Sequence, residues 1–272
     1  MRHDNGSAVT IGAYDGVHIG HRKVIEQVRR RAADAGLRSV VVTFDKNPAA
    51  VVNPASAPPR LTDVELKLEL LAKTGVDQIL VLEFDAERAK EKAEDFVDEV
   101  LVTGLAARVV VVGEDFHFGN ERRGNVELLR LIGEEAGFSV EPVHLVSDAA
   151  AHEVVSSTRI RALIAKGELA EAAALLGRPH EVRGTVVVGA GAGPGRPPGL
   201  LVEVPGEILL PPPGEYVGSA AADSGERVAA RLVVTNRVGR APQRLEISGL
   251  ELPLARLAVP GAEGDVVRAR FG

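Results

Sequence analysis

The 272-residue chain contains no cysteine. Disulfides, thiolate metal sites and cysteine nucleophiles are therefore excluded, which fits a reducing compartment. The chain also lacks an apolar run long enough to span a bilayer, and its N-terminus has no apolar signal-peptide core. We therefore expect a cytoplasmic protein with no membrane partner.

Positive charge is in the minority. The 32 lysines and arginines are outnumbered by 38 aspartates and glutamates, for a net charge of -6. This balance does not favour extended contact with a nucleic-acid backbone, so no nucleic-acid partner is expected. Apolar residues at 45% and charged residues at 26% are typical of a globular protein, and the length allows two domains. The oligomeric state is left open.

The first half of the chain alternates between apolar and amphipathic segments. Strands are predicted at 8–12, 37–44, 76–84, 107–113 and 138–146. Helices are predicted at 21–36, 62–75, 89–104 and 124–137. In the second of these helices, Thr62 and Glu65 have the spacing of a capping box. The alternation predicts a parallel sheet with right-handed crossovers, covered on both faces.

The second half changes character near Val182. Two short helices are predicted at 156–167 and 168–177. Short strands bounded by glycine and proline are predicted at 181–189, 199–204, 216–222, 227–236, 244–249 and 265–271. This spacing predicts a small antiparallel barrel. We expect two domains, 1–181 and 182–272.

A candidate ligand site follows the first predicted strand, in GAYDGVHIGH at 12–21. Ligands of open parallel sheets bind beyond the carboxyl ends of the strands. Gly12 and Gly16 allow close backbone approach, and His18 and His21 lie on one face of a helical first turn, where phosphate is favoured. Both imidazoles are expected to face solvent and ligand. The alternative interpretation is an ordinary glycine turn followed by surface histidines.

Two further segments carry candidate groups. SSTRIR at 156–161 places three hydroxyls and Arg161 at a helix start, which suits either a phosphate clamp or a simple helix cap with solvated arginines. VGEDFHFGNERRGN at 112–125 follows the fourth strand at the same sheet edge. Its Phe116 and Phe118 are either ordinary packing residues or flank a planar ring.

Together these segments resemble the FMN adenylyltransferase half of the bacterial bifunctional riboflavin kinase/FAD synthetase family. The family opening G-N-F-D-G-V-H-x-G-H is similar to GAYDGVHIGH, its S-S-T-x-x-R to 156–161, and its G-x-D-F-x-F-G to 113–119. The resemblance covers roughly residues 8 to 188. It implies an α/β fold, with a Rossmann-like nucleotidylyltransferase domain followed by a riboflavin-kinase-like β-barrel.

The resemblance also implies an activity: magnesium-dependent transfer of AMP from ATP to FMN, giving FAD and pyrophosphate. The implied catalytic residues are His18, His21 and Arg161. The implied nucleotide-binding residues are Gly12, Ala13, Tyr14, Asp15, Gly16, Gly113, Asp115, Ser156, Ser157 and Thr158. The implied acceptor-binding residues are Phe44, Lys46, Asn47, Pro48, Phe116, Phe118 and Arg122. Mg²⁺ is expected to enter with ATP, and its protein ligands are left open.

Departures from the family pattern leave the acceptor open. Ala13-Tyr14 replaces Asn-Phe, and Lys46-Asn47-Pro48 replaces Pro-His-Pro. The barrel half has no Pro-Thr-Ala-Asn motif, its glycine run at 189–199 is predicted to be a flexible loop, and Glu246 is either the family's catalytic glutamate or a solvated strand residue. We expect no riboflavin kinase activity. The alternatives are a nucleotidylyltransferase with another phosphate acceptor or NTP, and a non-catalytic flavin- or nucleotide-binding protein.

Overall fold

The computed structural model describes residues 5–144, 154–187, 199–222, 227–235, 242–249 and 265–272. The chain forms two compact units. The first comprises Met1–Pro58 and Lys67–Val155, and the second comprises Pro59–Leu66 and Ser156–Gly272.

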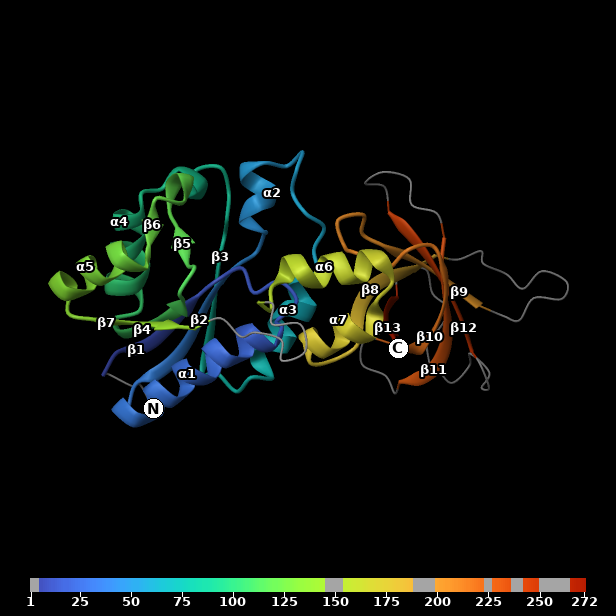
Figure 1. Cartoon of the computed structure of the whole chain (residues 1–272), viewed down its shortest axis with the longest axis horizontal. Coiled ribbons are helices and arrows are strands. Elements are labelled where there is room, and N and C mark those ends of the chain that lie inside the picture. Colours follow the sequence, from blue (N-terminus) through green and yellow to red (C-terminus); the bar gives the residue numbers. More distant parts are fainter. Residues whose placement is uncertain (1–4, 145–153, 188–198, 223–226, 236–241, 250–264) are drawn as a thin grey trace, which may run out of the picture. The chain divides into compact units, whose positions relative to one another are not determined.

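The first unit contains a five-stranded parallel sheet with the order β3-β2-β1-β4-β7 (Figure 1). Its strands are β1 Ser7–Ile11, β2 Arg38–Phe44, β3 Gln78–Leu82, β4 Ala107–Gly113 and β7 Ser139–Val143. All four strand pairings are parallel. The predicted parallel sheet is confirmed.

Helices and short turns connect these strands. The helices are α1 Ile19–Ala35, α2 Pro48–Val52, α3 Val64–Ala72, α4 Ala93–Phe96 and α5 Val126–Ala136. Three further segments are helical but not α-helical. They are the 3₁₀-helices η1 Arg88–Lys90 and η3 Asn120–Arg122 and the π-helix η2 Val97–Gly104. A two-stranded hairpin pairs β5 His117–Phe118 with β6 Gly124–Asn125.

Both faces of the parallel sheet are buried. Ala8 of β1 belongs to a cluster with Val28 and Ala32 of α1. The next residue, Val9, belongs to the opposite cluster with Phe96, where α4, η2 and α5 pack. Because successive strand residues point to opposite faces, burial on both sides explains the uninterrupted apolar runs.

Two predicted helix limits are wrong. α3 begins at Val64, two residues after the predicted start at Thr62, and Asp63 Oδ1 accepts the Leu66 N–H at 2.7 Å in its first turn. The helix predicted at 89–104 is interrupted, because Glu91 and Lys92 are extended with ψ of 135° and 152°.

The second unit contains two helices and a closed antiparallel barrel. The helices are α6 Ser157–Lys166 and α7 Leu169–Leu176. The barrel strands are β8 His180–Val187, β9 Gly199–Val204, β10 Gly214–Ala222, β11 Val228–Val234, β12 Gln243–Gly249 and β13 Val266–Phe271. They close in the order β10-β11-β12-β9-β8-β13, which confirms the predicted barrel. Most of the glycine run predicted as a loop lies outside the described residues.

The second unit begins earlier along the chain than the sequence suggests. The composition changes near Val182, which places the expected boundary at 181/182. In the structure α7 contacts β8, and the backbone of Arg60 bonds to that of Glu207 at 2.7 Å and of Leu209 at 2.8 Å. Packing therefore adds α6, α7 and Pro59–Leu66 to the barrel. Within the described part of the chain, no helix has the length and apolar character needed to cross a membrane.

Candidate active site

The strand order of the parallel sheet indicates where a ligand would bind. The chain moves from β1 outward to β2 and β3, and then returns to the other side of β1 to form β4. In such sheets the crevice beyond the carboxyl ends of the two strands at the reversal is the binding position. The loops that follow Ile11 and Gly113 therefore start at the reversal between β1 and β4.

The loop between β1 and α1 contains residues in left-handed backbone conformations. Tyr14 and Val17 have φ values of 50° and 41°, and Gly16 lies between them with a φ of 81°. The Val17 N–H closes the turn on the Tyr14 carbonyl at 3.1 Å. Left-handed conformations cost roughly 1–3 kcal/mol for residues other than glycine and gather at functional sites. The strain supports a functional role for this loop.

Tyr14 is a buried part of this loop. Its hydroxyl hydrogen-bonds Thr10 Oγ1 at 2.7 Å, and its ring lies over Gly12, where an added Cβ would stand 3.1 Å from the ring. Burial raises the pKa of Tyr14, and the Thr10 bond opposes this only in part. The phenol therefore stays neutral, and its ring packs against the loop backbone at Gly12. Sequence reasoning missed Thr10, although a hydroxyl inside a buried apolar strand was a usable signal.

His18 and His21 meet at the N-terminus of α1. His18 is the N-cap residue, and its Nδ1 accepts the His21 backbone N–H at 3.3 Å. The two rings stack with centroids 3.5 Å apart and an interplanar angle of 19°. The predicted pairing on one helical turn is confirmed. The expectation that both rings face solvent is wrong for His18, which is 5% exposed because it caps the helix beneath the loop.

The His21 ring is uncharged around neutral pH. Burial, and then repulsion from His18, lower the pKa of His21 well below its ordinary value. His21 Nδ1 is buried with no hydrogen-bond partner among the described residues. Because His18 Nδ1 accepts a hydrogen bond, a neutral His18 carries its proton on Nε2. The site offers oriented imidazole groups at a helix end, where an anion is favoured.

The loop after β4 carries the second predicted segment. Phe116 stacks on Phe118 with centroids 5.3 Å apart, and Phe118 lies 6.0 Å from Phe96. Both rings of the loop pack against the core under the sheet. Gly119 has a φ of 69°, and a Cβ there would meet Ala93 at 2.8 Å. The described contacts of these phenylalanines therefore match the packing interpretation.

The predicted acceptor loop follows β2. Asp45 Oδ1 accepts the backbone N–H groups of Lys46 at 2.7 Å and Phe84 at 2.8 Å. Asn47 Oδ1 caps α2 by accepting the Ala49 N–H at 3.1 Å. Lys46 is exposed, with Nζ 3.9 Å from the Asp45 carboxylate. The Asn47 carbonyl oxygen therefore serves the helix, whereas the Lys46 side chain extends from the loop.

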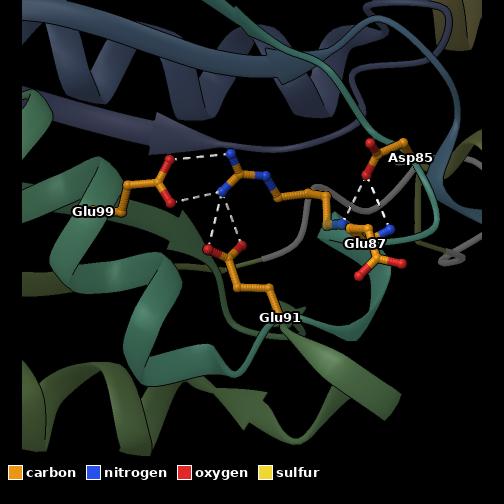
Figure 2. A network of polar contacts seen from close by, with 5 residues as sticks. Asp85, Glu87, Glu91 and Glu99 are labelled. Atoms are coloured by element: carbon orange, nitrogen blue, oxygen red, sulfur yellow. Dashed lines mark hydrogen bonds and ion pairs between the residues drawn. The ribbon is translucent and has the colours of Figure 1, made fainter.

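A polar network lies next to the predicted acceptor loop. The Arg88 guanidinium donates to the carboxylates of Glu91 and Glu99, with nitrogen–oxygen distances of 3.0–3.2 Å. Figure 2 labels these two glutamates, and its dashed lines mark the contacts. Asp85 Oδ1 accepts the Arg88 N–H at 2.8 Å, at the start of η1. The Glu91 carbonyl accepts the Asn120 N–H at 2.8 Å. Arg88 therefore belongs to a segment, η1, that contacts both α2 beside the predicted acceptor loop and η3 in the loop after β4.

The remaining predicted groups differ in their surroundings. Asp115 and Arg122 are exposed, and Arg122 has a φ of 59°. Ser156, Ser157, Thr158 and Arg161 belong to the second unit. There Ser156 Oγ accepts the Arg159 N–H at 3.2 Å and caps α6, while Arg161 Nε donates to the Pro59 carbonyl at 2.7 Å.

The structure thus groups three sets of predicted residues along one edge of the first unit's sheet. They are Gly12–His21, Phe44–Pro48 and Gly113–Arg122. A family model described as FAD synthetase matches residues 1–159. The chain belongs to the FAD synthetase family.

Relatives within this family carry a longer name. The bifunctional riboflavin kinase/FMN adenylyltransferase of Pseudomonas fluorescens is 38% identical over 184 residues, which are 68% of this chain and 58% of that protein. The protein of the same name from Escherichia coli strain K12 is 36% identical over 184 residues with the same coverage. The chain therefore matches less than two thirds of the length of these curated relatives.

A solved structure covers nearly the whole chain of this FAD synthetase family member. It is described as the crystal structure of a macrolide-efflux protein from Streptococcus pneumoniae. The match has a TM-score of 0.81 at 25% identity and covers 98% of this chain and 85% of that one. It agrees with the combination of a parallel α/β sheet and a closed barrel in one chain.

Proposed function

We propose that the protein transfers AMP from Mg-ATP to FMN, giving FAD and pyrophosphate. The observation that carries the proposal is the His18–His21 stack at the N-terminus of α1, beyond the strand reversal, in a chain of the FAD synthetase family. Paired imidazoles at a helix end suit a triphosphate because donors and helix dipole act together.

The reaction needs no nucleophile from the protein. An FMN phosphate oxygen attacks the α-phosphorus of ATP, the new P–O bond forms, and the bond to the bridging oxygen of the β-phosphate breaks. Pyrophosphate leaves with the electron pair. The barrier lies in bringing two anions together and in the charge that grows on the leaving group, so positioned donors should supply most of the catalysis.

The chain's own groups have distinct tasks in this scheme. His18 Nε2–H would donate to a phosphate oxygen, and the Gly12–Gly16 loop would let the nucleotide approach the backbone. Among the described residues, no three histidine, aspartate or glutamate side chains converge to hold a metal. We therefore expect Mg²⁺ to enter on the triphosphate of its substrate ATP and to neutralise part of its charge.

Arg161 and the three hydroxyl residues Ser156, Ser157 and Thr158 remain proposed phosphate-binding groups. Their support is the match to the family motif S-S-T-x-x-R and their place at the N-terminus of the ten-residue helix α6. Replacing Arg161 by methionine should raise the KM for ATP if the guanidinium binds phosphate. An unchanged KM would leave Arg161 with its bond to Pro59 as its role.

The direct test is incubation of the purified protein with Mg-ATP and FMN. FAD should form with an equal amount of pyrophosphate, measured by chromatography and a coupled pyrophosphate assay, and EDTA should stop both. A parallel panel of the four NTPs with other phosphate acceptors tests the alternative. The exposed Lys46 in the predicted acceptor loop favours that alternative. Formation of a different product without FAD would support the alternative and contradict transfer to FMN.

We also propose that the protein has no riboflavin kinase activity. Its barrel region contains no Pro-Thr-Ala-Asn motif to hold Mg-ATP. Glu246 lies in β12 between the buried residues Leu245 and Ile247, so its side chain points to the opposite, outer face of the barrel. Riboflavin with Mg-ATP should yield no FMN. Measurable FMN would contradict this and restore Glu246 as a candidate base.

A further inference from the structure

Lys67 of α3 is a buried charged residue that the reaction scheme does not use. Its side chain is 7% exposed. Its Nζ donates to the carbonyl oxygen of Phe44 at 2.6 Å and approaches that of Ala13 at 3.4 Å. Lysine is rarely buried without partners, because an ammonium group loses its hydration. These two carbonyls are therefore among the groups that accompany the buried ammonium.

The two carbonyls belong to different loops of the site. Ala13 lies in the loop between β1 and α1, directly before the left-handed Tyr14. Phe44 is the last residue of β2, directly before the acceptor loop at 45–48. Thr43 Oγ1 also reaches the Ala13 carbonyl at 3.4 Å, so side chains from β2 and α3 converge on this carbonyl.

The position of the ammonium suits the alignment of two substrates. The β1–α1 loop is the proposed nucleotide loop, and the segment after Phe44 is the proposed acceptor loop. A single buried group bonded to both fixes the distance between them. Displacements of about 1 Å can cost on the order of 100-fold in rate when two reactants must be aligned.

We propose that Lys67 is a positioning residue for AMP transfer, which holds the nucleotide loop and the acceptor loop in register through the Ala13 and Phe44 carbonyls. This inference rests on the proposed function for its kinetic consequence. Its structural premise, that the ammonium restrains both loops, does not depend on which phosphate is the acceptor.

The experiment compares three variants of the full chain. Lys67→Met keeps the length of the side chain and removes its donors, whereas Lys67→Gln keeps amide donors without the charge. Lys73→Met is the matched control, because Lys73 is an exposed lysine directly after the same helix. Hydrogen exchange of peptides covering 12–17 and 44–48 is measured without ligand, together with kcat, the KM values for ATP and FMN, and thermal unfolding.

Lys67→Met should accelerate exchange in both peptides and lower kcat on the order of 10- to 100-fold. Both KM values should change by less than roughly threefold, because loop register matters most in the transition state. Lys67→Gln should recover part of both effects, and Lys73→Met should match the wild type. If Lys67→Met fails to fold, Lys67→Gln alone carries the same comparison.

Two results would overturn the proposal. One is wild-type exchange in both peptides after loss of the ammonium. The other is a kcat that falls only in proportion to the fraction of folded protein, which would make Lys67 a purely structural residue. A wild-type chain that makes no FAD contradicts the proposed function instead, and the exchange data still decide whether Lys67 restrains the loops.

Discussion

His21 stacks on His18 with ring centroids 3.5 Å apart at the first turn of α1. Two imidazolium ions at that distance repel each other, and burial disfavours charge on His21 further. A triphosphate bound here, as proposed, would reverse this balance, because its negative charge favours the protonated ring. The proposed function therefore predicts that ligand binding and protonation are coupled at this site.

The first prediction follows from that coupling. Because the pKa of His21 lies well below its ordinary value in the free protein and rises beside a triphosphate, binding of Mg-ATP should take up protons near pH 6. Affinity should rise as the pH falls from about 7.5 to about 6. Calorimetry in two buffers of different ionisation enthalpy measures the uptake.

His21→Gln is the control for protonation of ATP itself, and proton uptake equal to that of the wild type would contradict the coupling. The free protein gives a second check. Below about pH 6.5 the unfolded chain binds a proton at His21 that the native state does not, so the free energy of unfolding should fall as the pH falls through this range. Urea unfolding of wild type and His21→Gln at several pH values measures the difference.

The second prediction concerns turnover. His18→Asn and His21→Gln should each lower kcat for FAD formation by roughly 100-fold, the scale of losing one oriented donor in a transition state. Asparagine at 18 keeps an acceptor for the helix cap, so loss of the imidazole is separated from loss of the cap. Lys23→Met changes an exposed cation on the same helix and should leave kcat unchanged. Wild-type turnover in both histidine variants would remove them from the site.

The sequence predicts local features of this site well. The apolar runs and glycine stops indicate the parallel sheet, and the spacing of His18 and His21 places both on one helical turn. The barrel follows from short strands between turn residues. These features depend on neighbours within a few positions along the chain, where propensity and periodicity act.

The contacts that fix the site could not be predicted in this way. Lys67 reaches Phe44 across 23 positions and Ala13 across 54. A lysine in an amphipathic helix ordinarily indicates a solvated face, and only tertiary packing shows that this one is buried. The start of α3 is a smaller case, because Thr62 and Asp63 are adjacent residues that both suit an N-cap, and sequence alone does not place the helix start at Val64.

The third prediction concerns the Arg88 network in Figure 2. Arg88→Met should lower the free energy of unfolding by about 1–2 kcal/mol, because it leaves the largely buried Glu91 carboxylate without its cation. Burial already raises the pKa of Glu91, and Arg88 opposes that rise. Urea unfolding at pH 7 measures the change.

Lys90→Met is the matched control on the same short turn. Its ion pair with Glu87 is exposed to solvent on both sides, so stability should not change measurably. Equal stability of Arg88→Met and wild type would show that the network contributes nothing. Faster hydrogen exchange at 119–124 in Arg88→Met alone would confirm that Glu91 transmits the restraint to Asn120.

The fourth prediction concerns the acceptor loop, where Lys46 and Asn47 replace the family's Pro-His. We expect the native chain to accept FMN but to bind it less tightly than the double variant Lys46→Pro/Asn47→His. Proline stiffens the loop, and an imidazole adds an aromatic surface for the flavin. Proline also removes the Lys46 N–H that bonds Asp45, but the Phe84 N–H still holds that carboxylate at 2.8 Å.

The variants separate charge from shape in this loop. Lys46→Met removes the exposed ammonium and leaves the Asn47 cap of α2 in place. If the ammonium attracts the acceptor phosphate, this single change should raise the KM for FMN by about 2- to 5-fold, as expected for one exposed charge pair worth at most about 1 kcal/mol. The double variant loses the same charge, so a lower KM there means that loop shape outweighs it.

Flavin fluorescence quenching gives the affinity, and initial rates give the KM. Unchanged or weaker FMN binding in the double variant would show that residues 46 and 47 do not determine the acceptor, and a native chain inert towards FMN would favour a different phosphate acceptor.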